Sequence, residues 1–184
     1  GNWQSPQSAG TVDLGSGVSA TDLDVKNKIV FMTGEASDHK KNDFFVIDAT
    51  DNNNPLIRSK INVGSGGLNA LDVAGSYAYV ANQEDEDQFM VIDVSVPSTS
   101  TIKSTLDLPN NNKEALSIFY RLGKVYIGTE KNSSGPEFYV INVSSSSNPQ
   151  VVGTKEIDAD VNAINVTENN SAYLATEDDF KELV

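Results

Sequence analysis

Acidic residues gather in short runs of this sequence, and they are the side chains best suited to chemistry. One run, "NQEDEDQF", holds four carboxylates in succession between two apolar segments. Clustered loop carboxylates suit Ca²⁺, which takes about six to eight oxygen ligands. Two opposed carboxylates are also the working pair of most glycoside hydrolases. The candidate residues for binding an ion or ligand are Glu84, Asp85, Glu86, Asp87, Asp158, Asp160, Glu177, Asp178 and Asp179.

The spacing of these acids selects neither a metal site nor a catalytic pair. No acidic run follows the D-x-[DN]-x-[DN]-G pattern of a calcium loop with its later Glu. His39 is the one histidine, and no G-x-S-x-G segment offers it a nucleophile for a Ser-His-Asp triad. We therefore expect an exposed loop histidine, no catalytic residue, no metal site and no cofactor, with calcium as the one ion that the acidic loops would suit.

The composition narrows the classes of partner. The formal net charge is −13, from 26 acidic and 13 basic residues, and such a surface repels the phosphate backbone of nucleic acids. The absence of cysteine excludes disulfides, thiol catalysis and thiolate metal sites. No apolar run approaches the roughly 18 residues of a membrane helix. We expect no nucleic-acid partner and no membrane insertion by this segment.

A repeated phrase indicates the elements that must position the acids. "FFVIDATDNNNP" from Phe44 returns as "FMVIDVSVPSTS" from Phe89 and as "FYVINVSSSSNP" from Phe138. Before each phrase come two alternating runs joined by a turn of Gly, Asn or Ser, which is the signature of a hairpin. A fourth apolar run follows each phrase. Four short strands, a to d, in about 45 residues are typical of a propeller blade.

The predicted fold is therefore an all-β propeller of four-stranded antiparallel blades, forming a single domain over residues 1–184. The N-terminal segment "PQSAGTVDL", residues 6–14, matches strand d of the later repeats. We expect it to complete the last blade and close a ring of about four blades, because an open ring leaves strand edges unpaired. The alternative is that the chain forms part of a larger propeller. The predicted repeats are 20–67, 68–115, 116–160, and 161–184 plus 6–14.

The second repeat carries a family resemblance. "GSYAYVANQEDEDQFMVIDVSVPST", residues 75–99, resembles the LVIVD-type propeller repeat of many bacterial and archaeal surface proteins. The first repeat departs from that motif at Ala49 and Thr50, and the third has Asn142 in place of the aspartate. The resemblance implies a propeller, an extracellular or cell-surface location and no particular activity. Full rings of this family usually have more than four blades, which keeps the larger propeller open as the alternative.

The aspartates of the phrase have an architectural explanation. Asp48 and Asp93 end strand c directly before a turn, where a side-chain oxygen accepts backbone N–H bonds in an Asx-turn. Asn142 forms the same turn without a charge, which argues against catalysis by these positions. Chemistry is expected instead in the b–c loops and d–a crossings, which share one face of a propeller. The a strands line the central channel, and a polar ring at its mouth would hold an ion, a small ligand or, preferably, ordered water; its residues are Thr21, Asn69, Ser117 and Asn162.

Three functions fit these features. The leading hypothesis is a non-enzymatic, exported interaction or scaffold domain that presents an acidic loop face to a protein, a glycan or a cationic surface. The second is a carboxylate-based hydrolase or lyase assisted by calcium. The third is a structural assembly module that associates with itself through its blade edges if the ring is open.

Overall fold

The structure is a computed structural model of the chain and describes residues 5, 7–36, 39–64 and 66–184. Fourteen β-strands make up the regular structure of these residues. They include no helical segment with the length and apolarity that crossing a bilayer requires. The strands are β1 (Ser19–Lys26), β2 (Ile29–Glu35), β3 (Phe44–Asp48), β4 (Leu56–Ile61), β5 (Leu68–Ala74), β6 (Tyr77–Asn82), β7 (Phe89–Asp93), β8 (Thr101–Leu106), β9 (Ala115–Arg121), β10 (Lys124–Thr129), β11 (Phe138–Asn142), β12 (Gln150–Lys155), β13 (Val161–Val166) and β14 (Ala172–Thr176).

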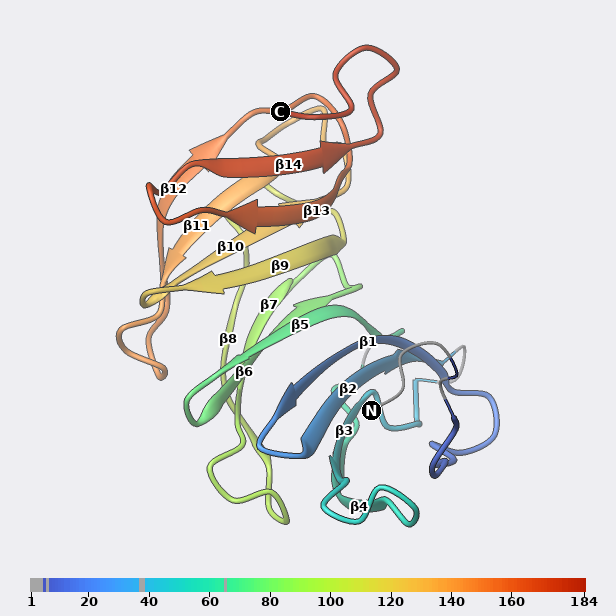
Figure 1. Cartoon of the computed structure of the whole chain (residues 1–184). Coiled ribbons are helices and arrows are strands. Elements are labelled where there is room, and N and C mark those ends of the chain that lie inside the picture. The colour runs from blue at the N-terminus through green and yellow to red at the C-terminus, as the bar shows by residue number, and fades with distance from the viewer. Residues whose placement is uncertain (1–4, 6, 37–38, 65) are drawn as a thin grey trace.

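Each sheet is one blade, with its strands paired antiparallel in chain order. In the described part of the chain, blades 1, 2 and 3 are the four-stranded sheets β1–β4, β5–β8 and β9–β12, and blade 4 is the β13–β14 pair. The a strands form a row, in which β5 packs beside β1, β9 beside β5 and β13 beside β9. Figure 1 shows the blades fanning out from this row, blade 1 toward the bottom of the view and blade 4 toward the top. The predicted all-β propeller architecture is confirmed.

Apolar side chains on both faces of each blade build the core between successive sheets. Because strand residues alternate between faces, the neighbouring valine and isoleucine of each phrase point toward different blades. Val91 belongs to the cluster between blades 2 and 3, whereas Ile92 belongs to the cluster between blades 1 and 2. A third cluster lies between blades 3 and 4. Blades 2 and 3 are thus each held between two neighbours.

The repeated phrase ends in the predicted Asx-turns. Asp48 Oδ1 accepts the N–H of Thr50 at 2.9 Å, Asp93 Oδ1 accepts that of Ser95 at 3.0 Å, and Asn142 Oδ1 accepts that of Ser144 at 3.1 Å. Hydrogen bonds from the hydroxyl and N–H of Thr50, together with those from Arg58, lower the pKa of Asp48 to about 2. The architectural interpretation of these positions is confirmed.

The predicted closure of a four-blade ring by residues 6–14 is wrong. Pro6 lies outside the described residues, and residues 7–14 form no strand. Ala9, Gly10 and Val12 lie instead against β2, β3 and the c–d turn of blade 1. Blade 4 gains only residues 182–184, whose backbone pairs with β14 as the start of a strand c. The described blades form an open arc (Figure 1), as the larger-propeller alternative predicts.

Aromatic side chains fill the joint between blades 2 and 3. Tyr79 on strand b of blade 2 and Tyr120 on strand a of blade 3 stack with their ring centroids 5.2 Å apart. Two aromatic rings near the row of a strands keep neighbouring sheets apart at their inner ends. The stacked pair fills the joint between blades 2 and 3, where the interior is close-packed.

Carboxylates of the a strands join neighbouring blades through backbone N–H groups. Asp24 Oδ2 accepts the N–H of Val73 at 3.0 Å, and Asp72 Oδ2 accepts that of Tyr120 at 2.7 Å. The strand registers make the two bonds equivalent, one between blades 1 and 2 and the other between blades 2 and 3. Burial raises the pKa of Asp72, because the charged form loses hydration there.

A buried polar side chain also fixes the loops of each four-stranded blade. These clip residues, Asp43, Gln88 and Glu137, are fully buried and directly precede the phenylalanine that opens strand c. Each accepts a backbone N–H from the d–a crossing that follows its own blade; the donors are Val63, Leu108 and Ile157. A clip residue therefore ties the end of a b–c loop to the crossing beside it. The clip residues were not identified from the sequence.

Glu137→Gln should destabilise the fold, because Glu137 is the clip residue that accepts the most backbone N–H groups. Its Oε1 accepts the N–H of Asn132 at 2.9 Å, and its Oε2 accepts those of Ile157 at 2.8 Å and Asp158 at 3.0 Å. An amide turns an NH₂ group toward buried donors, so we expect a loss of about 1–3 kcal/mol in the free energy of unfolding, measured in urea. Glu168→Gln, on an exposed turn, is the matched control. Equal losses in the two variants would contradict the clip.

Asp72→Asn should change how stability depends on pH. The raised pKa of Asp72 means that the folded chain holds its proton more tightly than the unfolded chain, so this group lowers stability as pH rises above about 4. Asparagine, which stands at the equivalent position 165 of blade 4, keeps the oxygen that accepts the N–H of Tyr120. We expect the melting temperature of Asp72→Asn to gain on that of the wild type between about pH 3 and pH 6.

Asp93→Asn supplies a control of opposite sign. Hydrogen bonds from the hydroxyl and N–H of Ser95 lower the pKa of Asp93, so its contribution is present above the ordinary carboxyl range and is lost as pH falls. The melting temperature of the wild type should therefore rise relative to that of Asp93→Asn over the same pH range. If the melting temperatures of both variants follow that of the wild type in parallel across this pH range, neither carboxyl is coupled to folding in this way.

Candidate functional site: the acidic loop face

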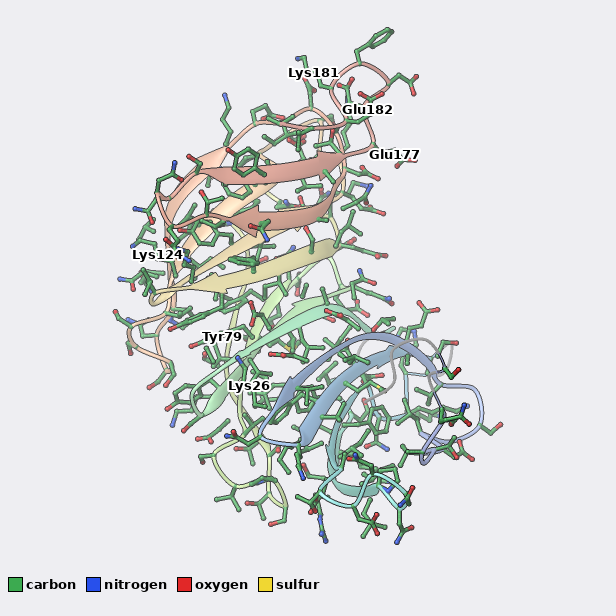
Figure 2. All side chains as sticks on the ribbon, viewed as in Figure 1. Lys26, Tyr79, Lys124, Glu177, Lys181 and Glu182 are labelled. Atoms are coloured by element: carbon green, nitrogen blue, oxygen red, sulfur yellow. The ribbon has the colours of Figure 1, made fainter. Side chains whose placement is uncertain are left out.

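The b–c loops and d–a crossings lie together on one face, called here the loop face. Four backbone hydrogen bonds among the described residues join a b–c loop to a d–a crossing; they run from the N–H groups of Ala36, Gln83, Glu130 and Glu177 to the carbonyls of Gly66, Gly67, Glu114 and Asp160, respectively. Figure 2 shows Glu177 at this end of its sheet, and Lys26 and Lys124 at the a–b turns of theirs, which form the opposite ends. The predicted sharing of one face by these loops is confirmed.

Five of the nine predicted acidic residues line one pocket of about 400 Å³, called here the acidic pocket, beside blade 4. Lys131 N–H donates to Asp160 Oδ1 at 2.7 Å, and Lys131 Nζ lies 3.5 Å from Asp158 Oδ1. Phe180 stands at the edge of the pocket with 91% of its side chain exposed. The five acidic residues are Asp158, Asp160, Glu177, Asp178 and Asp179.

The other four predicted residues, Glu84, Asp85, Glu86 and Asp87, occupy the b–c loop of blade 2. Glu84 Oε1 accepts the N–H of Gly66 at 3.0 Å and lies 3.9 Å from Nδ1 of His39. Burial, followed by the charges of Glu130, Asp85 and Glu84, raises the pKa of Glu114 on the neighbouring crossing. The contribution of these charges reflects the nearness of carboxylates that belong to separate loops.

The structure thus places the nine predicted residues in two groups. Within the described ranges, no three or more His, Asp or Glu side chains are arranged to hold a metal ion. Exposed carboxylates on neighbouring loops attract cationic groups through their summed field, which requires no fixed coordination geometry. Electrostatic attraction of a basic partner is therefore the chemistry that this arrangement supports.

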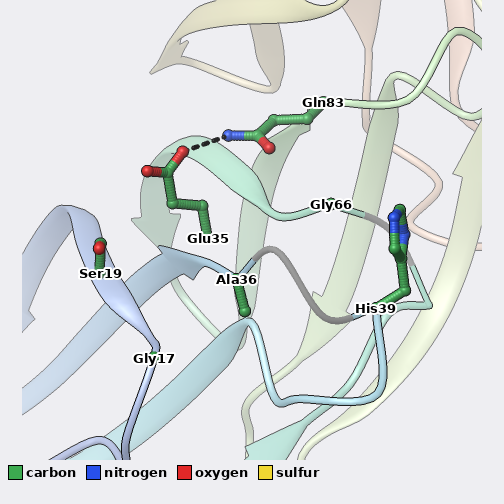
Figure 3. A pocket seen from close by; sticks show the side chains of 7 residues that line it. All are labelled: Gly17, Ser19, Glu35, Ala36, His39, Gly66 and Gln83. Carbon is green, nitrogen blue, oxygen red and sulfur yellow. Dashed lines mark hydrogen bonds between the residues drawn. The ribbon is translucent and has the colours of Figure 1, made fainter.

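A second pocket, of about 540 Å³, surrounds His39 between blades 1 and 2. Figure 3 shows Glu35 at the end of β2 and His39 in the b–c loop that follows it, with Gln83 bridging toward Glu35 from blade 2. Gln83 Nε2 donates to Glu35 Oε2 at 3.2 Å and to Asn69 Oδ1 at 2.8 Å. The side chain of His39 is largely exposed, as predicted. Its carboxylate neighbour is Glu84, and the hydrogen bonds drawn in the pocket do not form a serine–histidine relay.

The four predicted channel-mouth residues, Thr21, Asn69, Ser117 and Asn162, all line a depression of about 290 Å³ along the a strands. Three of them already bond the next blade: Thr21 Oγ1 donates to the carbonyl of Leu68, Asn69 Nδ2 to that of Ala115, and Ser117 Oγ to that of Val161. The strand registers differ from the predicted alignment by one residue, since Leu116 rather than Ser117 occupies the bulge position. Binding of water, an ion or a small ligand at this mouth stays a prediction.

Comparison with known proteins agrees with the blade architecture. The model of the LVIVD repeat family matches residues 66–107, which contain blade 2 and its acidic b–c loop. No curated protein matches the sequence.

Three solved structures share the fold at low sequence identity. The computationally designed Ika4 protein is 13% identical with a TM-score of 0.68, covering 94% of this chain and 94% of its own. The computationally designed Ika8 protein is 13% identical with a TM-score of 0.63, covering 90% of this chain and 44% of its own. The β-propeller domain of Myceliophteria thermophila Cps50 (Swd1) is 11% identical with a TM-score of 0.65, covering 94% of this chain and 56% of its own.

The repeated phrase, the four-stranded blades and these similarities lead to one conclusion. Residues 66–107 are an LVIVD repeat, and the chain has the fold of a β-propeller.

Proposed function

We propose that this chain is a non-enzymatic, exported interaction domain that presents its acidic loop face to a basic protein surface. A propeller with an LVIVD repeat suits an interaction or scaffold role. The observation that carries the finer proposal is the acidic pocket, where five carboxylates from two loops surround a space bordered by an exposed phenylalanine. Export rests on the resemblance of the repeat to those of surface proteins.

The acidic pocket offers two kinds of contact to a lysine or arginine side chain. Its carboxylates supply attraction that acts at a distance and speeds association. Phe180 supplies an aromatic face for the aliphatic stem and the charged head of the same side chain. Aromatic residues beside charged rims are typical of energetically important interface positions. The combination suits a basic protein segment better than a simple metal ion.

The contacts of the pocket carboxylates support a binding role over a catalytic one. Asp160 Oδ1 already accepts the N–H of Lys131, and Asp178 Oδ1 accepts that of Phe180 at 2.8 Å. Hydrolysis of a glycoside needs two carboxylates held rigidly on opposite sides of the bond to be cleaved. Here Glu177 and Asp179 are exposed on one loop, where solvent screens them. This arrangement favours an adaptable docking surface.

The proposal predicts that Glu177→Gln/Asp179→Asn weakens binding to a lysine-rich peptide. The double variant removes two charges from the pocket, and we expect the dissociation constant to rise by roughly threefold to tenfold at low salt. Fluorescence anisotropy with a labelled oligolysine measures this change, and Phe180→Ala should weaken binding further. The effect should shrink as salt screens the carboxylates.

The matched control is Asp51→Asn/Glu168→Gln, which removes the same charge from exposed turns outside the loop face. If the two double variants lose affinity equally, only net charge is being measured and the acidic pocket has no special role. A glycan array run on the same protein addresses the other class of partner. Binding to a neutral glycan that survives high salt would overturn a basic protein surface as the target.

A further inference from the structure

The two ends of the arc expose complementary halves of the interface that joins its blades. In every joint, one blade contributes a trailing face, which points toward the next blade, and that next blade contributes its leading face. The leading face of blade 1 and the trailing face of blade 4 have no blade against them in the arc. We propose that a second copy of the chain docks head to tail on these faces, so that two arcs close one ring. This proposal is independent of the acidic loop face.

The leading face of blade 1 is apolar and exposed where its counterpart is buried. Strand registers align Leu23 and Val25 with Leu71 and Val73 of blade 2. Leu23 and Val25 are 55% and 50% exposed, whereas Leu71 and Val73 are 5% and 1% exposed under blade 1. Large apolar side chains placed side by side on an otherwise acidic surface mark a contact site. Leu71 and Val73 are covered by the trailing face of blade 1. The same kind of face would therefore cover Leu23 and Val25.

The trailing face of blade 4 shows the matching exposure. Tyr173 occupies the strand-b position of Phe31, Tyr79 and Tyr126. Tyr173 is 48% exposed, whereas those three rings are 4%, 4% and 9% exposed. In the joint between blades 2 and 3, Tyr79 stacks on Tyr120, and the register places Tyr120 at the position of Val25. A head-to-tail joint therefore puts Tyr173 of one copy over Val25 of the other.

Leu183 extends the trailing face of blade 4. The bonds that join residues 182–184 to β14 place Leu183 at the position of Phe44 and Phe89. Those phenylalanines are fully buried in their joints, whereas 71% of the Leu183 side chain is exposed.

The polar groups that bond blades together are also present in unused form at the two ends. Inside the arc, the carbonyls of Leu68, Ala115 and Val161 accept side-chain bonds from the preceding blade. The register aligns the carbonyl of Ala20 with these acceptors, and it aligns Asn162 with the donors Thr21 and Asn69. Asn162 and Ala20 are both exposed. A second copy would place the amide of Asn162 against the carbonyl of Ala20 and repeat the bond a fourth time.

The carboxylate bonds repeat in the same way. Asp24 and Asp72 each accept an N–H from the next blade, and Asn165 stands at their position in blade 4. In a second copy this amide oxygen would lie beside the N–H of Val25, which in the single chain donates to Asp24 Oδ1 at 2.6 Å. An amide at this position avoids burying one more negative charge where two chains of charge −13 meet.

The N-terminal segment leaves room for this joint. Residues 9–12 run over β2, β3 and the c–d turn of blade 1, with an apolar pocket of about 270 Å³ between the segment and the sheet. Leu23 and Val25 lie beyond it on β1 and remain exposed. The segment thus occupies the place where the outer strands of a preceding blade pack. Strands β13 and β14 of the incoming copy would cover the inner part.

Two copies are the number that the shape of the arc favours. Blade 1 and blade 4 point in opposite directions from the row of a strands (Figure 1), so a two-fold rotation brings both pairs of end faces together at once. Head-to-tail contacts either close into a ring or continue as a filament. Here both joints of the ring are identical, and neither exposed end remains.

Sedimentation velocity of the wild-type chain over a wide range of concentration tests the ring. We expect a monomer of 19.8 kDa at low concentration to give way to a species of twice that mass. Because the copies repel through their charge and attract through apolar surface, the dimer should strengthen with added salt. A monomer at every concentration and salt overturns the proposal, and a mass that grows past two copies overturns the closed ring.

Charged substitutions on the two end faces, tested singly and as a mixture, distinguish head-to-tail docking from any other dimer. Val25→Asp should raise the dimer dissociation constant by roughly tenfold or more, and so should Tyr173→Lys, because each places a charge in an apolar contact. Mixing the two variants should restore a dimer, since one joint then pairs Asp with Lys and the other is wild type. A dimer formed through like faces would keep one variant fully associated and would gain nothing from mixing.

Val96→Asp and Leu122→Lys are the matched controls, because both side chains are exposed on turns away from the end faces. They should leave association unchanged. Far-ultraviolet circular dichroism confirms that each variant is folded, and Leu23→Asp replaces Val25→Asp if the latter is not. Equal weakening by the controls, or failure of the mixture to form a dimer, overturns the joint.

Discussion

Burial of alternating apolar side chains between successive sheets is the interaction on which the rest of this structure depends. A four-stranded sheet with two apolar faces has no stable form in water by itself, and each blade here is covered by its neighbours. Val91 and Ile92, adjacent in one strand, belong to different clusters on the two sides of blade 2. The polar bonds from Asp24 and Asp72 then fix how blade 1 aligns with blade 2 and how blade 2 aligns with blade 3. Packing between neighbouring blades therefore stabilises the fold more than contacts within a single blade do.

The loop face follows from this stacking. Because every blade has the same strand order, its b–c loop and its d–a crossing always emerge at the same end. The clip residues hold these connections on the sheet from within, so the outer parts of the loops vary without disturbing the core. The acidic pocket combines loops from blades 3 and 4, and neither blade would make it alone. A surface of this kind suits recognition, since a rigid frame carries it and its chemistry is local.

Much of the fold could be predicted from the sequence, because the same pattern of alternating apolar residues and turn residues recurs in every repeat. Alternation located the strands, and the exchange of Asp48 for Asn142 at one position revealed a turn-former. The sequence left a closed four-blade ring and a part of a larger propeller as alternatives, because the angle between blades depends on side chains that meet across joints, as Tyr79 and Tyr120 do. The position of Ser117 was missed by one residue because a bulge adds a residue without changing the pattern of residue types. The clip residues did carry a signal, a polar residue directly before each opening phenylalanine, which became meaningful once burial was known.

The turn at the end of each phrase has a consequence for the surface as a whole. It requires one side-chain oxygen at a fixed place, and carboxylate and carboxamide supply that oxygen equally, as Asp93 and Asn142 show. A single exchange of acid for amide there alters the charge of the molecule and leaves the backbone as it was. Substitutions at such positions can therefore change the surface charge, and with it the response of the protein to salt and pH, while the blades keep their shape.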